Sequence, residues 1–255
     1  MERKIGALKN GRVFTYAGVN WVKLDDLRGG ALVLSADSLF RRAFDTEGKN
    51  NFAVSSLNRE LNGDFLEALC REGAKKEDFV PLALDLTSDD GMTDYGITSA
   101  MIGLLSCEQF RKYRALIPNL NAEDWWWLVT PDSCLPQWGA FVRSVRTDGT
   151  LSDCSAYYGH VGVRPLCILK SEIFVSVEPE EGEERAAELD KMAEEAVHKI
   201  GAILKDLPPE ARETAAKGAL NAFAKVAMDM AFFKMTGIDP AKMRERAGDG
   251  QKKEE

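Results

Sequence analysis

Three consecutive tryptophans at 125–127 constrain the fold of this chain more than any other feature. In an extended strand, successive side chains point to opposite faces, so Trp125 and Trp127 share one face and Trp126 takes the other. Rings of this size are costly to leave in water. We therefore expect one face of the strand to lie in the core and the other to be covered by a second layer or offered to a partner. At least two of the three rings are predicted to be buried.

Composition narrows the class of protein. Of the 255 residues 45% are hydrophobic, which is enough apolar side chain for a packed core. The net charge is −8 and no block of five or more Lys and Arg occurs, which argues against nucleic-acid binding. No apolar run approaches the roughly 18–20 residues that span a bilayer, so we expect no membrane span. Residues 1–6 lead into no apolar segment, so we expect a cytoplasmic or virion-associated protein that is not secreted by a signal peptide.

The cysteines give no support for a metal site. They occur at widely separated positions, with no CxxC pair of the kind that binds structural zinc. We expect reduced and mostly buried thiols, no metal and no cofactor, although a Cys134–Cys154 bridge is conceivable. The five cysteines are Cys70, Cys107, Cys134, Cys154 and Cys167.

The chain changes character near Glu178. Before this point it reads as short strands and turns, and after it apolar residues recur at helical spacing on both sides of Pro208-Pro209. Glutamates around a proline and a glycine separate the two parts, as in a solvated hinge. The predicted parts are a mixed domain at 1–177, an acidic hinge at 178–184, a helical hairpin for oligomerisation or anchoring at 185–247, and a disordered tail at 248–255.

Local signals within the first domain predict short strands and two helices. Asp148-Gly149 lies between two alternating runs, which is a strong hairpin signal because glycine supplies the positive φ. Helix starts are indicated at Ser55 or Ser56 and at Ser106, where Gln109 completes a capping box. Strands are predicted at 12–16, 20–24, 31–35, 140–146 and 150–153, followed by strand structure within 161–177 that is interrupted at Pro165.

Five motifs in this order resemble the bacterial and phage domain family DUF6273. The resemblance covers about residues 10–177, with Val129-Thr130 standing where the family usually has Arg-Ser. The motifs are an early strand tryptophan at Trp21, the helix sequence from Ser55 to Phe65, a helix start from Leu104 to Glu108, the strand from Trp126 to Pro131, and the closing sequence from Gly162 to Leu166.

The resemblance implies a fold class and a context. The family is similar in pattern to C-type-lectin-like domains, which implies an α+β fold with short twisted antiparallel sheets, two helices and late loops that form a display surface. A C-terminal helical hairpin would follow this domain. The resemblance implies a phage or prophage context, which many relatives have, but it implies no settled activity.

The two irregular segments that flank the predicted hairpin hold the candidate ligand-binding residues. Aromatic and amide side chains in loops provide broad contact surfaces for proteins or sugars. The alternative is that the aromatic rings of these segments only cover the core. The candidate residues are Gln137, Trp138, Tyr157, Tyr158 and His160.

A second group of residues is predicted to be structural. Arg164, in the closing strand before Pro165, is expected to be half-buried and paired with a carboxylate or with loop carbonyls. The predicted structural core residues are Trp21, Trp125, Trp126, Trp127, Arg164 and Pro165.

The combined prediction is a non-enzymatic, phage- or prophage-derived recognition or structural protein. Its lectin-like surface would bind a protein or carbohydrate, and its helices at 185–247 would assemble it into a homo-oligomer or a virion. One alternative is an enzyme in which Cys154 or Cys134 is the nucleophile and His160 the base. Another alternative is a cytosolic module whose helices bind one specific partner.

Overall fold

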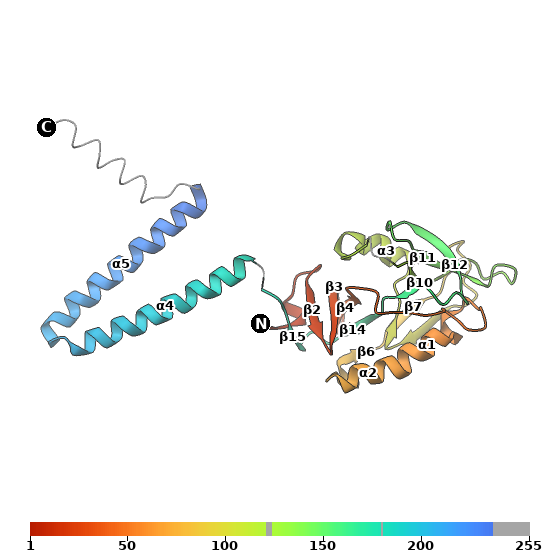
Figure 1. Cartoon of the computed structure of the whole chain (residues 1–255), viewed down its shortest axis with the longest axis horizontal. Helices are drawn as coiled ribbons and strands as arrows, with labels where there is room; N and C mark the ends of the chain where they lie inside the picture. Colours follow the sequence, from red (N-terminus) through yellow and green to blue (C-terminus); the bar gives the residue numbers. More distant parts are fainter. Residues whose placement is uncertain (121–123, 180, 237–255) are drawn as a thin grey trace, which may run out of the picture. The chain divides into compact units, whose positions relative to one another are not determined.

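The structure is a computed structural model of the full chain, and it describes residues 1–120, 124–179 and 181–236. The chain divides into two compact units, Met1–Glu178 and Pro179–Glu255. The first unit is an α+β domain with curled, mainly antiparallel sheets (Figure 1). The predicted α+β class is therefore confirmed for this unit.

The largest sheet has eight strands in the order β1-β15-β2-β3-β4-β14-β6, with β9 also pairing to β14. Pairing within this sheet is antiparallel throughout, and β4 and β14 at its centre are buried along their whole length. Its strands are β1 (Glu2–Lys4), β2 (Val13–Tyr16), β3 (Val19–Leu27), β4 (Gly30–Ser35), β6 (Phe79–Val80), β9 (Ile102–Gly103), β14 (Leu166–Leu169) and β15 (Phe174–Ser176).

Two smaller sheets complete the unit. A five-stranded sheet has the order β12-β11-β10-β13-β5, and β7 pairs with β8 in a separate ribbon. The five strands are β5 (Phe40–Arg41), β10 (Trp126–Pro131), β11 (Phe141–Val145), β12 (Leu151–Ser155) and β13 (Gly162–Val163), and the ribbon is formed by β7 (Leu82–Asp85) and β8 (Ile97–Ala100).

The helices begin where the sequence places their caps. The side chain of Ser55 accepts a hydrogen bond from the backbone N–H of Asn58, and Ser106 forms the predicted capping box with Gln109. In Figure 1, α1 and α2 run along one side of the unit, whereas α3 lies beside β10. The helical segments are α1 (Ser56–Glu60), a π-helical turn (Leu61–Phe65), α2 (Leu66–Arg71) and α3 (Cys107–Tyr113), with 3₁₀ turns at Ile5–Ala7, Phe52–Val54, Lys76–Asp78 and Arg114–Leu116.

Two hairpins, including the one predicted at Asp148-Gly149, form as their turn residues require. Ala17 and Gly18 both adopt positive φ, at 49° and 72°, which matches a two-residue turn between β2 and β3. Gly149 has a φ of 74° in the turn between β11 and β12, where Asp148 binds the hydroxyl and N–H of Thr150. Local turn chemistry thus fixes both registers.

The tryptophan strand β10 lies in the middle of its sheet and is covered on both faces. The ring of Trp126 packs edge-on to Phe110 of α3, with centroids 5.7 Å apart. The ring of Trp127 packs against Phe44 at the same separation, and its Nε1 donates to the carbonyl of Arg42. Both rings are buried because a different layer covers each face.

Trp125 corrects the prediction that all three tryptophans belong to the core. Its side chain remains 36% exposed because the residue precedes β10 and lies beyond the layers that cover the strand. The guanidinium of Arg146 lies over its ring, 5.1 Å from the centroid. Trp125 contributes to the sheet through its backbone carbonyl, which accepts a hydrogen bond from the N–H of Gly162.

Arg164 is buried more deeply than predicted, with 1% of its surface exposed. Its guanidinium donates to the carbonyls of Ser35, Ala36 and Pro118, and it lies over the ring of Trp126 at 5.1 Å. The predicted carbonyl partners are present, although that of Ser35 belongs to the end of β4 and not to a loop, and the side chain is buried instead of half-buried. Desolvation lowers the pKa of Arg164 to about 10, so it is still protonated at neutral pH.

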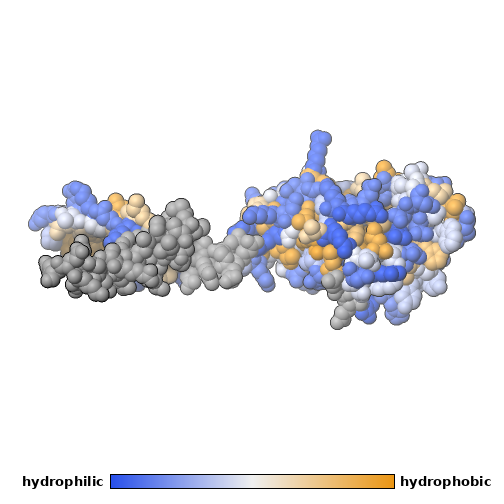
Figure 2. Space-filling view, turned by 90° about the horizontal axis from the view of Figure 1, so that it is seen from above, coloured by the Kyte–Doolittle hydropathy of each residue, from blue (hydrophilic) through white to orange (hydrophobic). Residues whose placement is uncertain are grey.

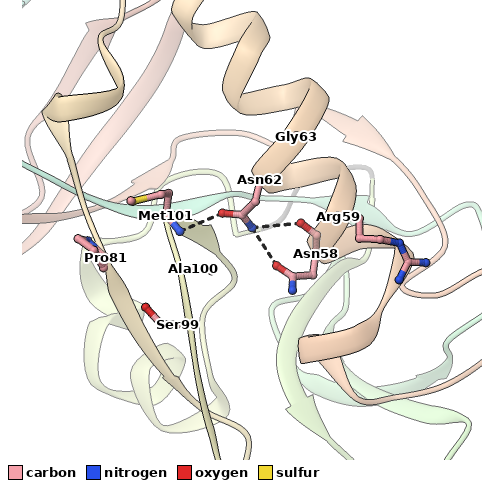
Figure 3. Close-up of a pocket in the computed structure, with 8 residues that line it drawn as sticks. All are labelled: Asn58, Arg59, Asn62, Gly63, Pro81, Ser99, Ala100 and Met101. Carbon is pink, nitrogen blue, oxygen red and sulfur yellow. Dashed lines mark hydrogen bonds between the residues drawn. The ribbon is translucent and has the colours of Figure 1, made fainter.

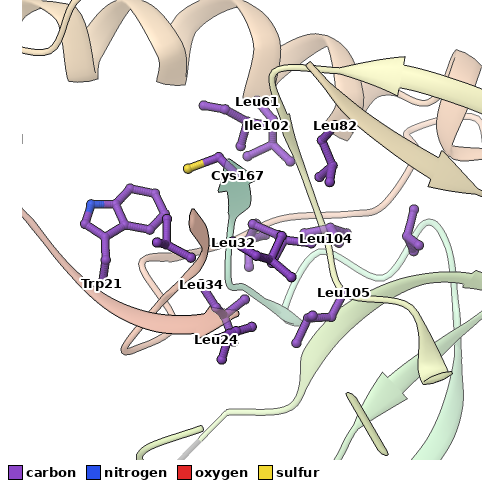
Figure 4. Packing of buried hydrophobic residues seen from close by; sticks show 14 of the residues in the cluster. Trp21, Leu24, Leu32, Leu34, Leu61, Leu82, Ile102, Leu104, Leu105 and Cys167 are labelled. Atoms are coloured by element: carbon purple, nitrogen blue, oxygen red, sulfur yellow. The ribbon is translucent and has the colours of Figure 1, made fainter. Parts of the chain in front are cut away.

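The hydrophobic core runs continuously through the first unit. Trp21 is fully buried and its Nε1 donates to the carbonyl of Tyr16. Figure 4 shows Trp21 and Cys167 packed near leucines from β3 and β4 and near Ile102 of β9. Pro165 is also buried, and its carbonyl accepts a hydrogen bond from the N–H of Ser35.

The second unit contains the long helices α4 (Glu181–Asp206) and α5 (Pro209–Thr236). Because α4 begins at Glu181, the helix includes part of the range predicted as an acidic hinge. The end of the predicted hairpin segment, residues 237–247, and the predicted tail at 248–255 lie outside the described residues. Among the described residues, no helix is both long and apolar enough for a membrane span.

We predict that Trp126→Ala lowers the free energy of unfolding of the first unit by about 3–5 kcal/mol, because it leaves a cavity between β10 and α3. The matched variant Trp125→Ala should cost less than about 1 kcal/mol, because its ring already contacts water. Urea titration followed by tryptophan fluorescence measures both values. Equal losses for the two variants would contradict the double coverage of β10.

Candidate functional site

The two predicted ligand-binding segments meet at one end of the β11–β12 hairpin. The pairing of Phe141 with Ser155 brings together the loop before β11 and the loop after β12. Beyond this pair, the N–H of Ala156 donates to the carbonyl of Ala140 at 2.7 Å. The loops at 132–140 and 156–161 therefore form one surface, which we call the aromatic loop surface.

All five candidate residues are exposed at this surface. Trp138, Tyr157 and Tyr158 expose 51%, 65% and 50% of their areas, and Gln137 and His160 are exposed as well. The rings of Tyr158 and His160 meet edge-on, with centroids 5.4 Å apart. The rings of Trp138 and Phe141 lie side by side, with centroids 6.2 Å apart. Of the three rings, that of Tyr157 is the most exposed.

A fully buried amide, Asn50, holds the loop at 132–140 in place. Its Nδ2 donates to the carbonyls of Ser133 and Phe141, at 2.8 and 3.0 Å, and weakly to that of Trp138. Its backbone N–H donates to the carbonyl of Gly139. One side chain thus satisfies carbonyls at both ends of the loop, which fixes the path of its backbone.

Asn50 also connects a third loop to the aromatic loop surface. Its Oδ1 accepts a hydrogen bond from the hydroxyl of Tyr95, at 2.8 Å. Burial raises the pKa of Tyr95, with smaller contributions from the charges of Cys134 and Asp94, so the phenol stays protonated and donates. Sequence reasoning missed Asn50, because a single asparagine in a loop belongs to no pattern.

The loop at 45–50 supports the tyrosine side of the surface. The carboxylate of Asp45 accepts hydrogen bonds from the N–H groups of Glu47, Lys49 and Ser56, which closes the loop on itself. The N–H of Asp45 donates to the carbonyl of Ala156. The buried Asp45 therefore ties this loop to the segment that carries Tyr157.

A pocket of about 420 Å³ lies between α3, the end of β10 and the loop after β7. Asp89 lies in its lining and faces two cations, with Arg143 Nε at 3.4 Å and Arg111 Nη2 at 3.7 Å. Arg143 also pairs with Asp132 at 3.3 Å. The carboxylates and guanidinium groups of this cluster pair with one another, so we infer that the cluster holds the loop at 86–96 against β11.

The structure gives the predicted Cys/His pair no direct link. All five cysteines are free, which leaves no Cys134–Cys154 bridge. The thiol of Cys134 points to the carbonyl of Met92 at 3.9 Å, and no hydrogen bond joins either thiol to His160 among the described residues. Burial raises the pKa of Cys154, which disfavours the thiolate that a nucleophile needs. Within the same residues, no group of acidic, histidine and cysteine side chains has the arrangement of a metal site.

Fold and loops together define an α+β domain that presents an aromatic loop surface on a rigid sheet. Residues 105–171 match the family model described as "Domain of unknown function (DUF6273)", and this match confirms the predicted family for this segment. It contains β10 to β14 and both aromatic loops, but not the motifs at Trp21 and 55–65. No curated protein and no solved structure matches the chain.

We predict that Asn50→Ala loosens the loop at 132–140 without unfolding the domain. Several buried carbonyls and the hydroxyl of Tyr95 would lose their partner, which should cost about 2–3 kcal/mol. Hydrogen exchange should become faster for the amides of Trp138 and Phe141. The neighbouring Asn51→Ala, which removes only a cap on Ala53, should leave these rates unchanged. Unchanged exchange in Asn50→Ala would show that other contacts hold the loop.

Proposed function

We propose that this protein is a non-enzymatic recognition protein whose first unit binds a ligand at the aromatic loop surface. The observation that carries the proposal is the exposure of Trp138, Tyr157 and Tyr158 on two held loops. The buried Asn50 holds the loop of Trp138, and the buried Asp45 bonds to Ala156 beside the tyrosines. Exposed rings of this size are unfavourable in water unless a partner covers them. Rigid loops lower the entropic cost of binding, because little ordering remains to be done.

The chemistry of the surface favours a ligand without strong charge. The exposed candidates are three aromatic rings, one amide and one histidine, and none of them carries a fixed charge. Ring faces stack on apolar ligand surfaces, while the amide and the phenol hydroxyls exchange hydrogen bonds. A carbohydrate or a weakly charged protein surface has this combination of groups.

The family resemblance supplies the proposed setting. A C-type-lectin-like arrangement would place the late loops at a display surface, and the two aromatic loops lie in the part that matches the DUF6273 model. A phage or prophage origin, as the resemblance implies, would make this protein a component that recognises a host surface.

The second unit is proposed to assemble several copies of the chain. Its helices expose large apolar side chains, and Figure 2 shows hydrophobic residues at the surface of the described helical segments. Because a helix pair gains stability by burying such residues, a second copy would cover them. The exposed apolar residues of α4 and α5 are Met192, Val197, Ile203, Leu220 and Met228.

Recognition is tested with the triple variant Trp138→Ser, Tyr157→Ser, Tyr158→Ser in the full chain. We expect the wild type to bind spots on an array of neutral bacterial glycans or of purified bacterial surface proteins, and the variant to lose at least about tenfold in affinity, since a few aromatic anchors carry most binding energy. The matched control Phe174→Ser removes an exposed ring in β15 and should bind like the wild type. Identical profiles for the triple variant and the wild type would refute the proposed surface.

Assembly is tested by Ile203→Glu and Leu220→Glu in the full chain. A charge at a covered apolar position is strongly unfavourable, so both variants should lower the mass measured by light scattering towards that of one chain. Lys205→Glu, on the same helix, also introduces a glutamate and should keep the wild-type mass. A wild-type mass of one chain would show that α4 and α5 do not assemble copies.

A further inference from the structure

A second pocket lies between the π-helical turn and the β7–β8 ribbon, and no predicted site residue lines it. Its volume is about 540 Å³, within the range of ligand sites. Figure 3 shows the helix that carries Asn58 and Asn62 on one side, with Pro81, which precedes β7, and Ser99 of β8 on the other. Its lining residues are Asn58, Arg59, Asn62, Gly63, Pro81, Ser99, Ala100 and Met101.

On the side of the pocket formed by β8, backbone N–H and C=O groups are free to form hydrogen bonds with a ligand. The N–H of Leu86 donates to the carbonyl of Gly96, so 86 and 96 form a hydrogen-bonded antiparallel pair. Pairs alternate along such a ladder, which makes Leu84–Thr98 and Leu82–Ala100 hydrogen-bonded pairs as well. The N–H and C=O of Ser99 therefore point away from β7. In the described part of the chain, β8 pairs with no other strand.

The side chain of Asn62 shows that an amide group can bind to the backbone just after β8. Its Oδ1 accepts hydrogen bonds from the N–H groups of Met101 and Ile102, at 2.9 and 3.0 Å. Its Nδ2 donates to the carbonyl of Ile102 at 2.8 Å. A side-chain amide thus takes the place of a neighbouring strand at 101–102, while the equivalent groups of Ser99, two residues earlier, remain available in the pocket.

The helix wall adds one cation and open space. The Nη1 of Arg59 donates to the carbonyl of Val54, and the guanidinium is exposed. Arg59 forms no ion pair with a carboxylate within the described residues. A Cβ at Gly63 would have no heavy atom within 4 Å, so the backbone of the π-helical turn borders empty space. The pocket therefore combines amide-type hydrogen-bonding groups with a single positive charge.

From this geometry we propose that the pocket binds an extended peptide segment of a partner protein, which adds to the free edge of β8 and places a carboxylate beside Arg59. Strand addition uses the outward N–H and C=O of Ser99, and the cation selects for an acidic side chain or a free carboxyl terminus. This inference does not depend on the aromatic loop surface, because the two sites share no residue.

The test uses the immobilised full chain and a random octapeptide pool with free carboxyl termini, alongside the same pool with amidated ends. Peptides retained from each pool are identified by mass spectrometry, and the affinity of the best-retained peptide is measured by fluorescence anisotropy. We expect retention of peptides that carry an acidic residue or a free carboxyl terminus. Failure to retain any peptide from either pool would overturn the proposal.

Ser99→Pro and Ser99→Ala form the matched pair of variants. Proline removes only the outward N–H, which the β7–β8 ladder does not use, and an edge position of this kind tolerates it. We expect Ser99→Pro to lower the affinity about tenfold and Ser99→Ala to change it less than about twofold, because alanine keeps the N–H. Equal affinities for the two variants would rule out strand addition.

Two further variants keep the test decisive if Ser99→Pro fails to fold. Gly63→Trp should fill the open space and abolish binding without loss of stability, and Arg59→Gln should weaken acidic peptides at least about fivefold. The triple variant of the aromatic loop surface should bind the peptide normally, which separates this site from the recognition site. Full binding by Gly63→Trp would place the peptide elsewhere and refute the proposal.

Discussion

The buried guanidinium of Arg164 is the contact on which the two main sheets of the first unit depend. It lies between β13, which belongs to the five-stranded sheet, and β14, which belongs to the eight-stranded sheet. Its hydrogen bonds reach the carbonyls of Ser35 and Ala36 at the end of β4 and that of Pro118, while the guanidinium lies over the ring of Trp126. A buried charge is costly unless its donors are satisfied, and here carbonyls and a ring face satisfy them in place of a carboxylate.

The contacts of Arg164 with both sheets help to hold the strands that follow α3 in a fixed arrangement. Because Arg164 and Phe110 hold one face of β10 and Phe44 holds the other, the strand cannot shift without breaking contacts on both sides. The β11–β12 hairpin pairs with this strand, so its open end, from which the two aromatic loops extend, is also held in place. Asn50 then repeats the same solution on a smaller scale, with one buried polar group satisfying several loop carbonyls.

Two surfaces with different chemistry result from this framework. The aromatic loop surface offers rings without fixed charge, which suits contact over a broad area. The pocket beside β8 offers backbone groups and the cation of Arg59, which suits a narrow extended segment. The two proposals together assign target binding to the loops and binding of a partner peptide to the ribbon. The separation follows from the fold, because the loops extend from the five-stranded sheet and the ribbon belongs to neither large sheet.

The sequence by itself determined the features that depend on neighbouring residues. The caps at Ser55 and Ser106, the Asp148-Gly149 turn and the alternation of the tryptophans involve contacts a few residues apart, so their residue types suffice. Only the tertiary structure decided the depth of Arg164, the role of Asn50 and the exposure of Trp125. Arg164 bonds to residues 128 and 129 positions away, and Asn50 bonds to residues 83 and 91 positions away. No local pattern encodes such pairs, because they form only when the sheets pack and each buried polar group must find a partner.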